Sequence, residues 1–230
     1  HATVFCSPHN PCGRVWERWE LERAMELFRK HDVYVVSDEI WSDLILDGSR
    51  HIPTQSVSED AWQRTAAIYA PSKTFNMAGL GSSCMIIPNP EVKQRIQEAY
   101  DSRWMFGPSD LAFTAMEAAY NHGDKWMDEQ CRYLMENVKI VNEFAAEKLP
   151  KVQVTTHEGT FLMWLDMTCF GKTSGELTTI LAKEYGIALG DGRHYGEQAE
   201  GFMRLNIGCT HDTLRKGLEQ LAKFYADYMK

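Results

Sequence analysis

The chain has 230 residues, 44% of them hydrophobic and 24% charged, with a formal net charge of -8 at pH 7. This length suffices for one large domain or two small ones, and the acidic balance argues against a nucleic-acid-binding surface. No apolar run approaches the roughly 18 residues of a membrane span. The six cysteines are scattered without a CxxC pair, which favours reduced thiols in a cytoplasmic protein over disulfides or a zinc site.

The first part of the chain alternates short apolar runs with helical patterns. An apolar helical face with i, i+3, i+4, i+7 spacing begins at Leu21. Residues 33–36 form a continuous apolar run, which is typical of a strand buried on both faces. Further strand-like runs lie at 4–6, 66–70 and 84–87. Strands that alternate with helices predict a mostly parallel α/β sheet.

The second part of the chain predicts an α+β arrangement. Thr173 and Glu176 have the spacing of a capping box that opens a helix, and Gly186 is a stop signal for it. We divide the chain into domains at 1–115 and 116–230, with a long linking helix near the start of the second. The expected helices are 125–148, 173–185 and one that contains Leu214, Leu218 and Leu221; the expected strands are 152–156, 160–166, 187–189 and 203–207.

Three polar residues follow apolar strand runs: Asn10, Asp38 and Lys73. In open α/β sheets, ligands bind beyond the carboxyl ends of the strands, and right-handed crossovers place those ends at one edge. We therefore expect an amide, a carboxylate and an amine to converge. Each residue also has a structural alternative, since Asn favours turns, Asp caps helices and Lys is usually solvated. Elsewhere, His157 and His194 show no metal-ligand spacing, so no metal site is expected.

Four short motifs carry a family resemblance. Ser-Pro-His-Asn-Pro-Cys-Gly spans 7–13, Ser-Asp-Glu-Ile spans 37–40, Ser-Lys-Thr-Phe-Asn-Met-Ala-Gly-Leu spans 72–80 and Arg-Leu-Asn-Ile-Gly spans 204–208. Together they resemble the aminotransferase class I/II family of fold-type I pyridoxal 5′-phosphate (PLP) enzymes, and within it the cystathionine β-lyase-like group of MalY and PatB type. The resemblance implies part of a mostly parallel PLP-transferase large-domain sheet, followed by a smaller α+β C-terminal domain.

The resemblance assigns roles to five residues. Lys73 matches the lysine that forms a Schiff base with PLP and later acts as the base at Cα, a role that needs a primary amine. Asp38 matches the carboxylate that keeps the pyridine nitrogen protonated, and Asn10 matches the residue that hydrogen-bonds the 3′-oxygen of the ring. Arg204 matches the arginine that holds the substrate α-carboxylate through a planar fork. Ser72 is a candidate contact for the phosphate.

Two positions depart from the family pattern. Many members carry a tyrosine three residues after the aspartate, where this chain has Trp41, which cannot accept a hydrogen bond. Asn10 would then be the main partner of the 3′-oxygen. Many members also place a phosphate-binding arginine eight residues after the lysine, where this chain has Gly81, although the lyase-like group often lacks that arginine.

The resemblance also implies parts that this sequence does not contain. The family normally has a long N-terminal segment with a phosphate-binding loop and an aromatic residue that stacks on the PLP ring. We therefore expect this chain to be the C-terminal part of an enzyme, and to be inactive and bind PLP weakly or not at all when alone. The full-length protein is expected to be a homodimer that binds a small amino-acid substrate, without a nucleic-acid or membrane partner.

Three functions remain open from the sequence. The leading hypothesis is a PLP-dependent carbon–sulfur β-lyase that acts on cystathionine- or cysteine-type amino acids and gives pyruvate, ammonia and a thiol. An aminotransferase shares the early steps, and no residue of the sequence reports which later step follows. A non-catalytic aminotransferase-like regulatory module is a further alternative; intact Lys73, Asp38, Asn10 and Arg204 argue against loss of cofactor binding, but not against a regulatory role.

Overall fold

The computed structural model describes every residue except 104, 106 and 230, and the chain forms two compact units. The division between them falls inside α6 (Asp124–Lys148), so this helix contributes to both units. The domain boundary that we predicted between residues 115 and 116 remains a prediction. The first unit contains residues 1–9 and 14–129, and the second contains residues 10–13 and 130–230.

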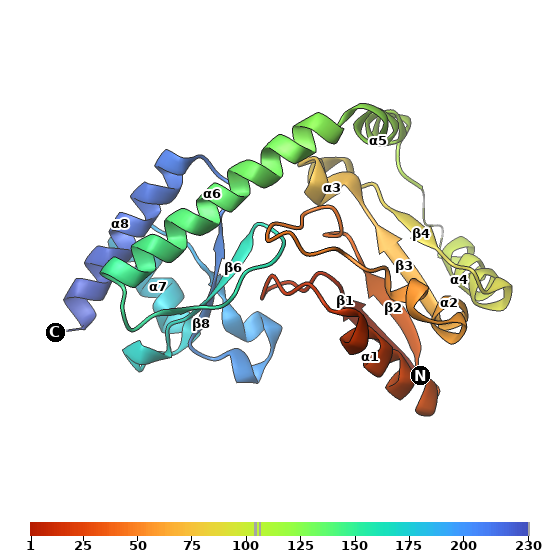
Figure 1. The fold of residues 1–230 in the computed structure, drawn as a ribbon, viewed down its shortest axis with the longest axis horizontal. Helices are drawn as coiled ribbons and strands as arrows, with labels where there is room; N and C mark the ends of the chain where they lie inside the picture. Colours follow the sequence, from red (N-terminus) through yellow and green to blue (C-terminus); the bar gives the residue numbers. More distant parts are fainter. Residues whose placement is uncertain (104, 106, 230) are drawn as a thin grey trace. The chain divides into compact units, whose positions relative to one another are not determined.

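The first unit is built on a four-stranded sheet with the strand order β1-β2-β3-β4 (Figure 1). β1 (Ala2–Cys6), β2 (Tyr34–Asp38) and β3 (Thr65–Tyr69) pair in parallel, and β4 (Cys84–Ile86) pairs antiparallel with β3. The prediction of a mostly parallel sheet is therefore confirmed. Because the parallel register aligns the last residues of β1 and β2, their carboxyl ends lie at one edge of the sheet.

Helix α1 (Arg18–Lys30) covers part of this sheet. It begins where the side chain of Glu20 accepts the N–H of Glu17 at 2.8 Å, which satisfies one of the free donors of the first turn. Its apolar face buries Met25 in a cluster with Val35 of β2. The other helices of this unit are α2 (Glu59–Arg64), α3 (Pro71–Thr74), α4 (Pro90–Ser102) and α5 (Asp110–His122), with the short 3-10 helices η1 (Thr54–Val57) and η2 (Ala78–Leu80).

The second unit contains an antiparallel sheet with the strand order β5-β6-β8-β7. The predicted strand at 187–189 lies instead at Gly190–Asp191, because Gly186 ends the preceding helix with φ +69° and the N–H of Ile187 still bonds to Leu181. Pairing with the neighbouring strand therefore begins only at Gly190. The strands are β5 (Gln153–Val154), β6 (Leu162–Asp166), β7 (Gly190–Asp191) and β8 (Phe202–Asn206).

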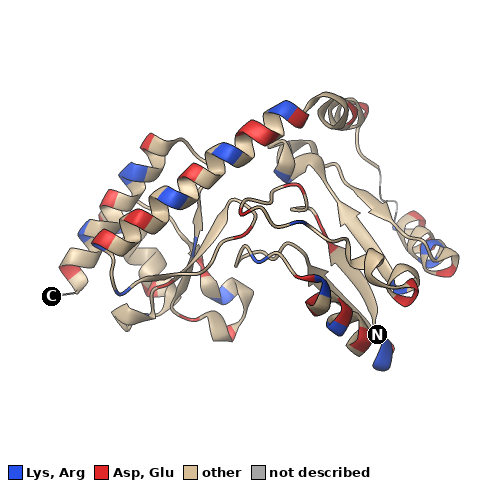
Figure 2. Cartoon of the chain, in the orientation of Figure 1, with Lys and Arg blue, Asp and Glu red and all other residues tan. Residues whose placement is uncertain are grey.

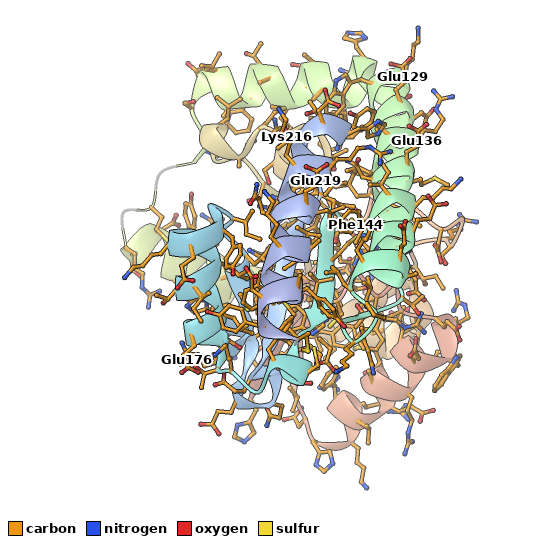
Figure 3. The ribbon with its side chains drawn as sticks, turned by 90° about the vertical axis from the view of Figure 1, so that its left-hand side faces the viewer. Glu129, Glu136, Phe144, Glu176, Lys216 and Glu219 are labelled. Carbon is orange, nitrogen blue, oxygen red and sulfur yellow. The ribbon has the colours of Figure 1, made fainter. Side chains whose placement is uncertain are left out.

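Three helices pack on the sheet of the second unit: α6, α7 (Ser174–Tyr185) and α8 (His211–Tyr228). Figure 3 looks onto them where they lie side by side, with Phe144 on α6, Glu176 on α7 and Lys216 on α8. The predicted capping box of α7 is present, since Glu176 accepts the N–H of Thr173 at 2.8 Å. The buried cluster joins Leu149 next to α6, Leu177 and Leu181 of α7, Leu221 and Phe224 of α8, and Leu165 and Met203 of the sheet. The remaining 3-10 helices are η3 (Thr168–Phe170), η4 (Gly192–Tyr195) and η5 (Glu197–Ala199).

Charged side chains of both signs alternate along the helices, as Figure 2 shows for α6 and α8. In α6, for example, Lys139 lies 3.7 Å from Glu143 one turn later, a spacing that supports an exposed helix. No helix among the described residues combines the length and apolar character that a membrane span needs. Within the same described part of the chain, no group of His, Cys, Asp or Glu side chains has the arrangement of a metal site.

Candidate active site

Asp38 is the last residue of β2, and the neighbouring strand β3 leads to Lys73. The register pairs Asp38 with Ile68, and Lys73 follows five residues later in α3, so both residues lie beyond the same edge of the sheet. Asp38 Oδ1 accepts the N–H of Ile40 at 3.3 Å, which turns the chain after the strand. Among the residues that the structure describes, no cationic side chain forms an ion pair with Asp38. The predicted carboxylate and amine therefore reach the same edge through neighbouring parallel strands.

Lys73 is held in place by the segment that follows β2. Its Nζ atom lies 5.5 Å from the centroid of the Trp41 ring, within the range of a cation–π interaction. The next residue, Thr74, donates its hydroxyl proton to Asp43 at 2.7 Å, which fixes α3 to the same segment. Trp41 is thus a departure from the family pattern with a contact of its own, which the sequence did not reveal.

Asn10 and Arg204 meet within the second unit. Arg204 lies in the middle of β8 and donates from one guanidinium nitrogen to Asn10 Oδ1 at 3.1 Å, although the two residues are 194 positions apart. The ring of Tyr195 lies 5.3 Å from the guanidinium carbon and covers it. The structure therefore brings together two of the residues that the sequence motifs single out.

A turn at 157–160 supports the loop that carries Asn10. The carbonyl of Gly13 accepts the N–H groups of Glu158 and Gly159 at 3.0 and 2.9 Å. Gly13 has φ +70°, and a Cβ atom built on it would lie 2.3 Å from His157 Nδ1. Position 13 therefore requires glycine for both its backbone conformation and its close contact. The sequence around His157 excluded metal-ligand spacing but gave no sign of this supporting role.

Two positions concern the phosphate: Ser72, the predicted contact, and Gly81, where many family members carry an arginine. Ser72 lies in α3 directly before Lys73, and its hydroxyl forms no hydrogen bond with the described residues. Gly81 ends η2 in the left-handed conformation with φ +60°. An arginine at this position would have to adopt a backbone conformation that side chains other than glycine rarely take. Glycine adopts this backbone conformation readily, whereas arginine rarely does.

Each unit offers its own chemistry. In the first, the Lys73 amine can bond to a carbonyl carbon or accept a proton, and the Asp38 carboxylate can face a protonated ring nitrogen. In the second, Arg204 offers a planar fork of N–H donors that matches a carboxylate. No carboxylate among the described residues occupies that fork through an ion pair.

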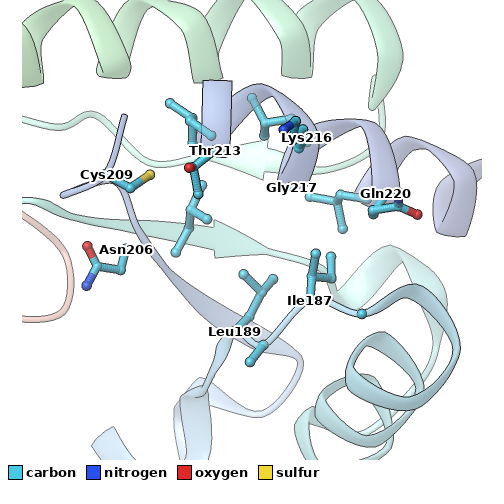
Figure 4. A pocket seen from close by; sticks show the side chains of 14 residues that line it. Ile187, Leu189, Asn206, Cys209, Thr213, Lys216, Gly217 and Gln220 are labelled. Carbon is cyan, nitrogen blue, oxygen red and sulfur yellow. The ribbon is translucent and has the colours of Figure 1, made fainter. Parts of the chain in front are cut away.

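A cavity of about 480 Å³ also lies in the second unit, between α8 and the segment at 186–189 (Figure 4). Ile187, Leu189, Cys209 and Lys216 are among the residues that line it. None of the predicted site residues takes part in the lining, so the cavity is separate from the chemistry described above.

The sequence profile of one family, described as "Aminotransferase class I and II", matches residues 2–221. The chain belongs to the aminotransferase class I and II family. The four motifs that carry the resemblance all lie within the matched residues.

Named members of this family give the comparison more detail. The chain is 40% identical over 218 residues to "Cystathionine beta-lyase PatB" of Bacillus subtilis (strain 168), covering 95% of this chain and 56% of the relative. It is 34% identical over 219 residues to "Protein MalY" of Escherichia coli (strain K12), covering 95% of this chain and 55% of the relative. The chain thus spans a little over half the length of these curated relatives.

The fold agrees with a solved structure of the family. Cystalysin from Treponema denticola, whose crystal structure contains a pyridoxal 5′-phosphate cofactor, superimposes with a TM-score of 0.95 at 33% identity. The superposition covers 100% of this chain and 58% of cystalysin. The architecture of both units is therefore that of a fold-type I PLP enzyme.

Proposed function

We propose that the full-length protein is a PLP-dependent carbon–sulfur β-lyase that acts on cystathionine- or cysteine-type amino acids. One observation carries the proposal: Asp38 and Lys73 follow neighbouring parallel strands at one sheet edge, each without an ionic partner among the described residues. The relationship to PatB, which is named a cystathionine β-lyase, supports the choice of reaction. The overall change consumes the amino acid and one water molecule and releases pyruvate, ammonia and a thiol.

The residues of the first unit fit PLP through the chemistry of their side chains. When bound, PLP supplies an electron-accepting pyridine ring that stabilises negative charge at the substrate Cα. Lys73 would hold PLP through its amine and, once the substrate has taken its place, accept the proton from Cα. Asp38 would hold a proton on the pyridine nitrogen through its negative charge. The free hydroxyl of Ser72, next to Lys73, is available to donate to the phosphate.

The residues of the second unit fit the amino-acid substrate and the oxygen of the ring. Arg204 would orient the substrate by binding its α-carboxylate through two parallel hydrogen bonds. Asn10 accepts from Arg204 through Oδ1, and its amide nitrogen, which has no hydrogen-bond acceptor among the described residues, can donate to the 3′-oxygen of PLP. The Asn10–Arg204 hydrogen bond thus joins the residue proposed to bind the PLP ring oxygen to the residue proposed to bind the substrate.

An aminotransferase is the second candidate, because the matching family profile is described by that activity. It requires the same carboxylate, amine and guanidinium, so the residues above serve both reactions. The two differ in the fate of the β-substituent and in the need for a 2-oxo acid that accepts the amino group.

The test is to incubate the full-length protein, loaded with PLP, with cystathionine in the presence and absence of a 2-oxo acid. A lyase releases pyruvate and a thiol without the oxo acid. An aminotransferase releases no pyruvate without the oxo acid, and it transfers the amino group when the oxo acid is present. We further propose that the full-length protein is a cytoplasmic homodimer; sedimentation equilibrium would test the dimer, and cell fractionation would test the location.

A further inference from the structure

A fully buried carboxylate lies directly beside the proposed site and takes no part in the mechanism above. Glu39 has a side chain with 0% exposure and accepts four hydrogen bonds. We call the five residues concerned the Glu39 network: Ser37, Glu39, His51, Thr54 and Tyr69. A buried charge with this many donors needs an explanation, because taking a carboxylate out of water is costly.

The network divides its hydrogen bonds between the two oxygens of Glu39. Oε1 accepts from the Ser37 hydroxyl at 2.8 Å and from the Thr54 N–H at 3.0 Å. Oε2 accepts from His51 Nε2 and from the Tyr69 hydroxyl, both at 2.7 Å. Burial opposes the charge, but the contacts from His51, Tyr69 and Thr54 outweigh it and hold the pKa of Glu39 below its usual range. The carboxylate is therefore kept ionised in the interior.

The network holds both strand ends that carry the proposed site. On the β2 side, Ser37 and Glu39 flank Asp38, and the N–H of Glu39 continues the pairing to Ile68 of β3. Side chains alternate along an extended strand, so Asp38 points away from the face on which its two neighbours are buried. On the β3 side, Tyr69 is the last residue of the strand and lies four residues before Lys73.

We infer that Glu39 is a positioning residue that fixes Asp38 and Lys73 relative to each other. This inference rests on the proposed function, since it concerns the same carboxylate and amine. Glu39 does not touch the reacting atoms; it acts through the ends of β2 and β3. Misplacement of catalytic groups by about 1 Å lowers rates by up to about 100-fold, so loss of the network is expected to affect kcat more than KM.

The experiment compares three variants of the full-length protein loaded with PLP. E39Q replaces one acceptor oxygen with a donor nitrogen, so the side chain can no longer accept all four hydrogen bonds. Y69F removes only one of the four bonds and serves if E39Q does not fold. Q55L is the matched control: Gln55 is also buried and donates to the carbonyl of Thr65, at the start of β3, and to the carbonyl of Ile86 in β4.

The readouts are kcat and KM for cystathionine, the visible circular dichroism of bound PLP per unit absorbance, and the thermal midpoint. In E39Q, we expect kcat to fall about 10-fold with KM changed less than about twofold, and the visible dichroism to fall by about half. In Y69F, we expect kcat and the visible dichroism to fall as well, but by less than in E39Q. Q55L is expected to lower the thermal midpoint while its kcat and dichroism stay at the wild-type value.

The inference is overturned if E39Q and Y69F retain the wild-type kcat and dichroism. It is also overturned if Q55L, at the same loss of thermal stability, loses as much kcat and dichroism as they do. The wild type separates this outcome from failure of the proposed function. A wild-type protein that shows no PLP absorption band contradicts the proposed function, and the inference falls with it. A wild-type protein that binds PLP but transfers an amino group instead of releasing pyruvate contradicts only the lyase reaction, and kcat for amino-group transfer then replaces pyruvate release in the same comparison.

Discussion

The two units hold their proposed site residues by different means. In the first unit, Asp38 and Lys73 lie at strand ends and in a short helix, and a buried polar network fixes the ends of β2 and β3. In the second, Arg204 lies in the middle of β8, paired with Trp164 of β6, in a sheet that rests on a large apolar cluster. Polar networks depend on direction and charge, whereas apolar cores depend on volume. The two units should therefore respond to different substitutions.

The largest effect is expected from Lys73 in the first unit. K73A removes the amine that would hold PLP and accept the Cα proton, so kcat/KM for cystathionine should fall by about 1,000-fold or more. The free energy of unfolding should change by less than about 1 kcal/mol, because the substitution removes one cation–π contact, with Trp41. Steady-state kinetics and urea unfolding of the full-length protein measure the two effects.

Lys151 provides the control for this change, because it is an exposed lysine outside the site. K151A should leave kcat/KM and stability at their wild-type values. Should K73A retain more than about a tenth of the wild-type activity, the lysine would not be the group that accepts the proton.

The second unit should be most sensitive to loss of volume in its core. Phe224 is 0% exposed and contacts the rings of Phe170 and Tyr185, so F224A should lower the free energy of unfolding by about 3–5 kcal/mol. F224L keeps most of the volume and should cost less than about 2 kcal/mol. Urea unfolding gives both values. Equal losses in the two variants would show that the volume of this side chain does not determine the stability of the unit.

A third substitution tests how the second unit holds Asn10. Gly13 has φ +70° and no room for a Cβ, since His157 and Gly159 lie within 3 Å of that position. G13A should lower the free energy of unfolding by about 1–3 kcal/mol and raise KM for cystathionine, because the displaced loop carries the partner of Arg204.

Gly81 supplies a matched control for the backbone cost alone. It also has a positive φ, +60°, but nothing lies within 4 Å of an added Cβ. G81A should therefore cost about 1 kcal/mol without a change in KM. A KM that rises equally in both variants would argue against a specific role of the contact between Gly13 and the turn at 157–160.

Much of the fold was accessible from the sequence because its signals are local. The run at 33–36 became β2, and the Thr173–Glu176 capping box and the Gly186 stop bound α7 as expected. The predicted strand at 187–189 was displaced to 190–191 because apolar content alone does not reveal which residues find a partner strand. Local patterns thus fixed the type of each element better than its edges.

The site was accessible only in part, because its contacts join distant positions. Motifs singled out Asn10 and Arg204, but no local pattern indicates a hydrogen bond across 194 positions. The role of Glu39 was hidden for the same reason, since three of its four partners lie 12 to 30 residues away along the chain. From the sequence alone, Glu39 is an ordinary polar residue that follows a strand and lies next to Asp38. Only the tertiary structure shows that it is fully buried.

The smallest expected effect is a difference in pH dependence between the two kinds of unit. The pKa of Glu39 lies below its usual range in the folded protein, so its contribution to stability is present above the unfolded pKa of about 4.3 and is lost as the pH falls through the folded pKa. Two partly buried carboxylates whose pKa is lowered by an arginine, Asp60 in the first unit and Asp191 in the second, add to the same trend. E39Q should therefore show a shallower loss of stability than the wild type below about pH 4.3.

Urea unfolding at a series of pH values from 7 to about 3 measures this slope, with Q55L again as the control for lost hydrogen bonds. Q55L should keep the wild-type slope, because it removes no titrating group, whereas F224A should lower stability by the same amount at every pH. If the stability of E39Q falls with pH as steeply as that of the wild type, the pKa of Glu39 is not lowered in the folded protein. The contrast between a polar first unit and an apolar second unit would then rest on hydrogen bonding alone, without a contribution from charge.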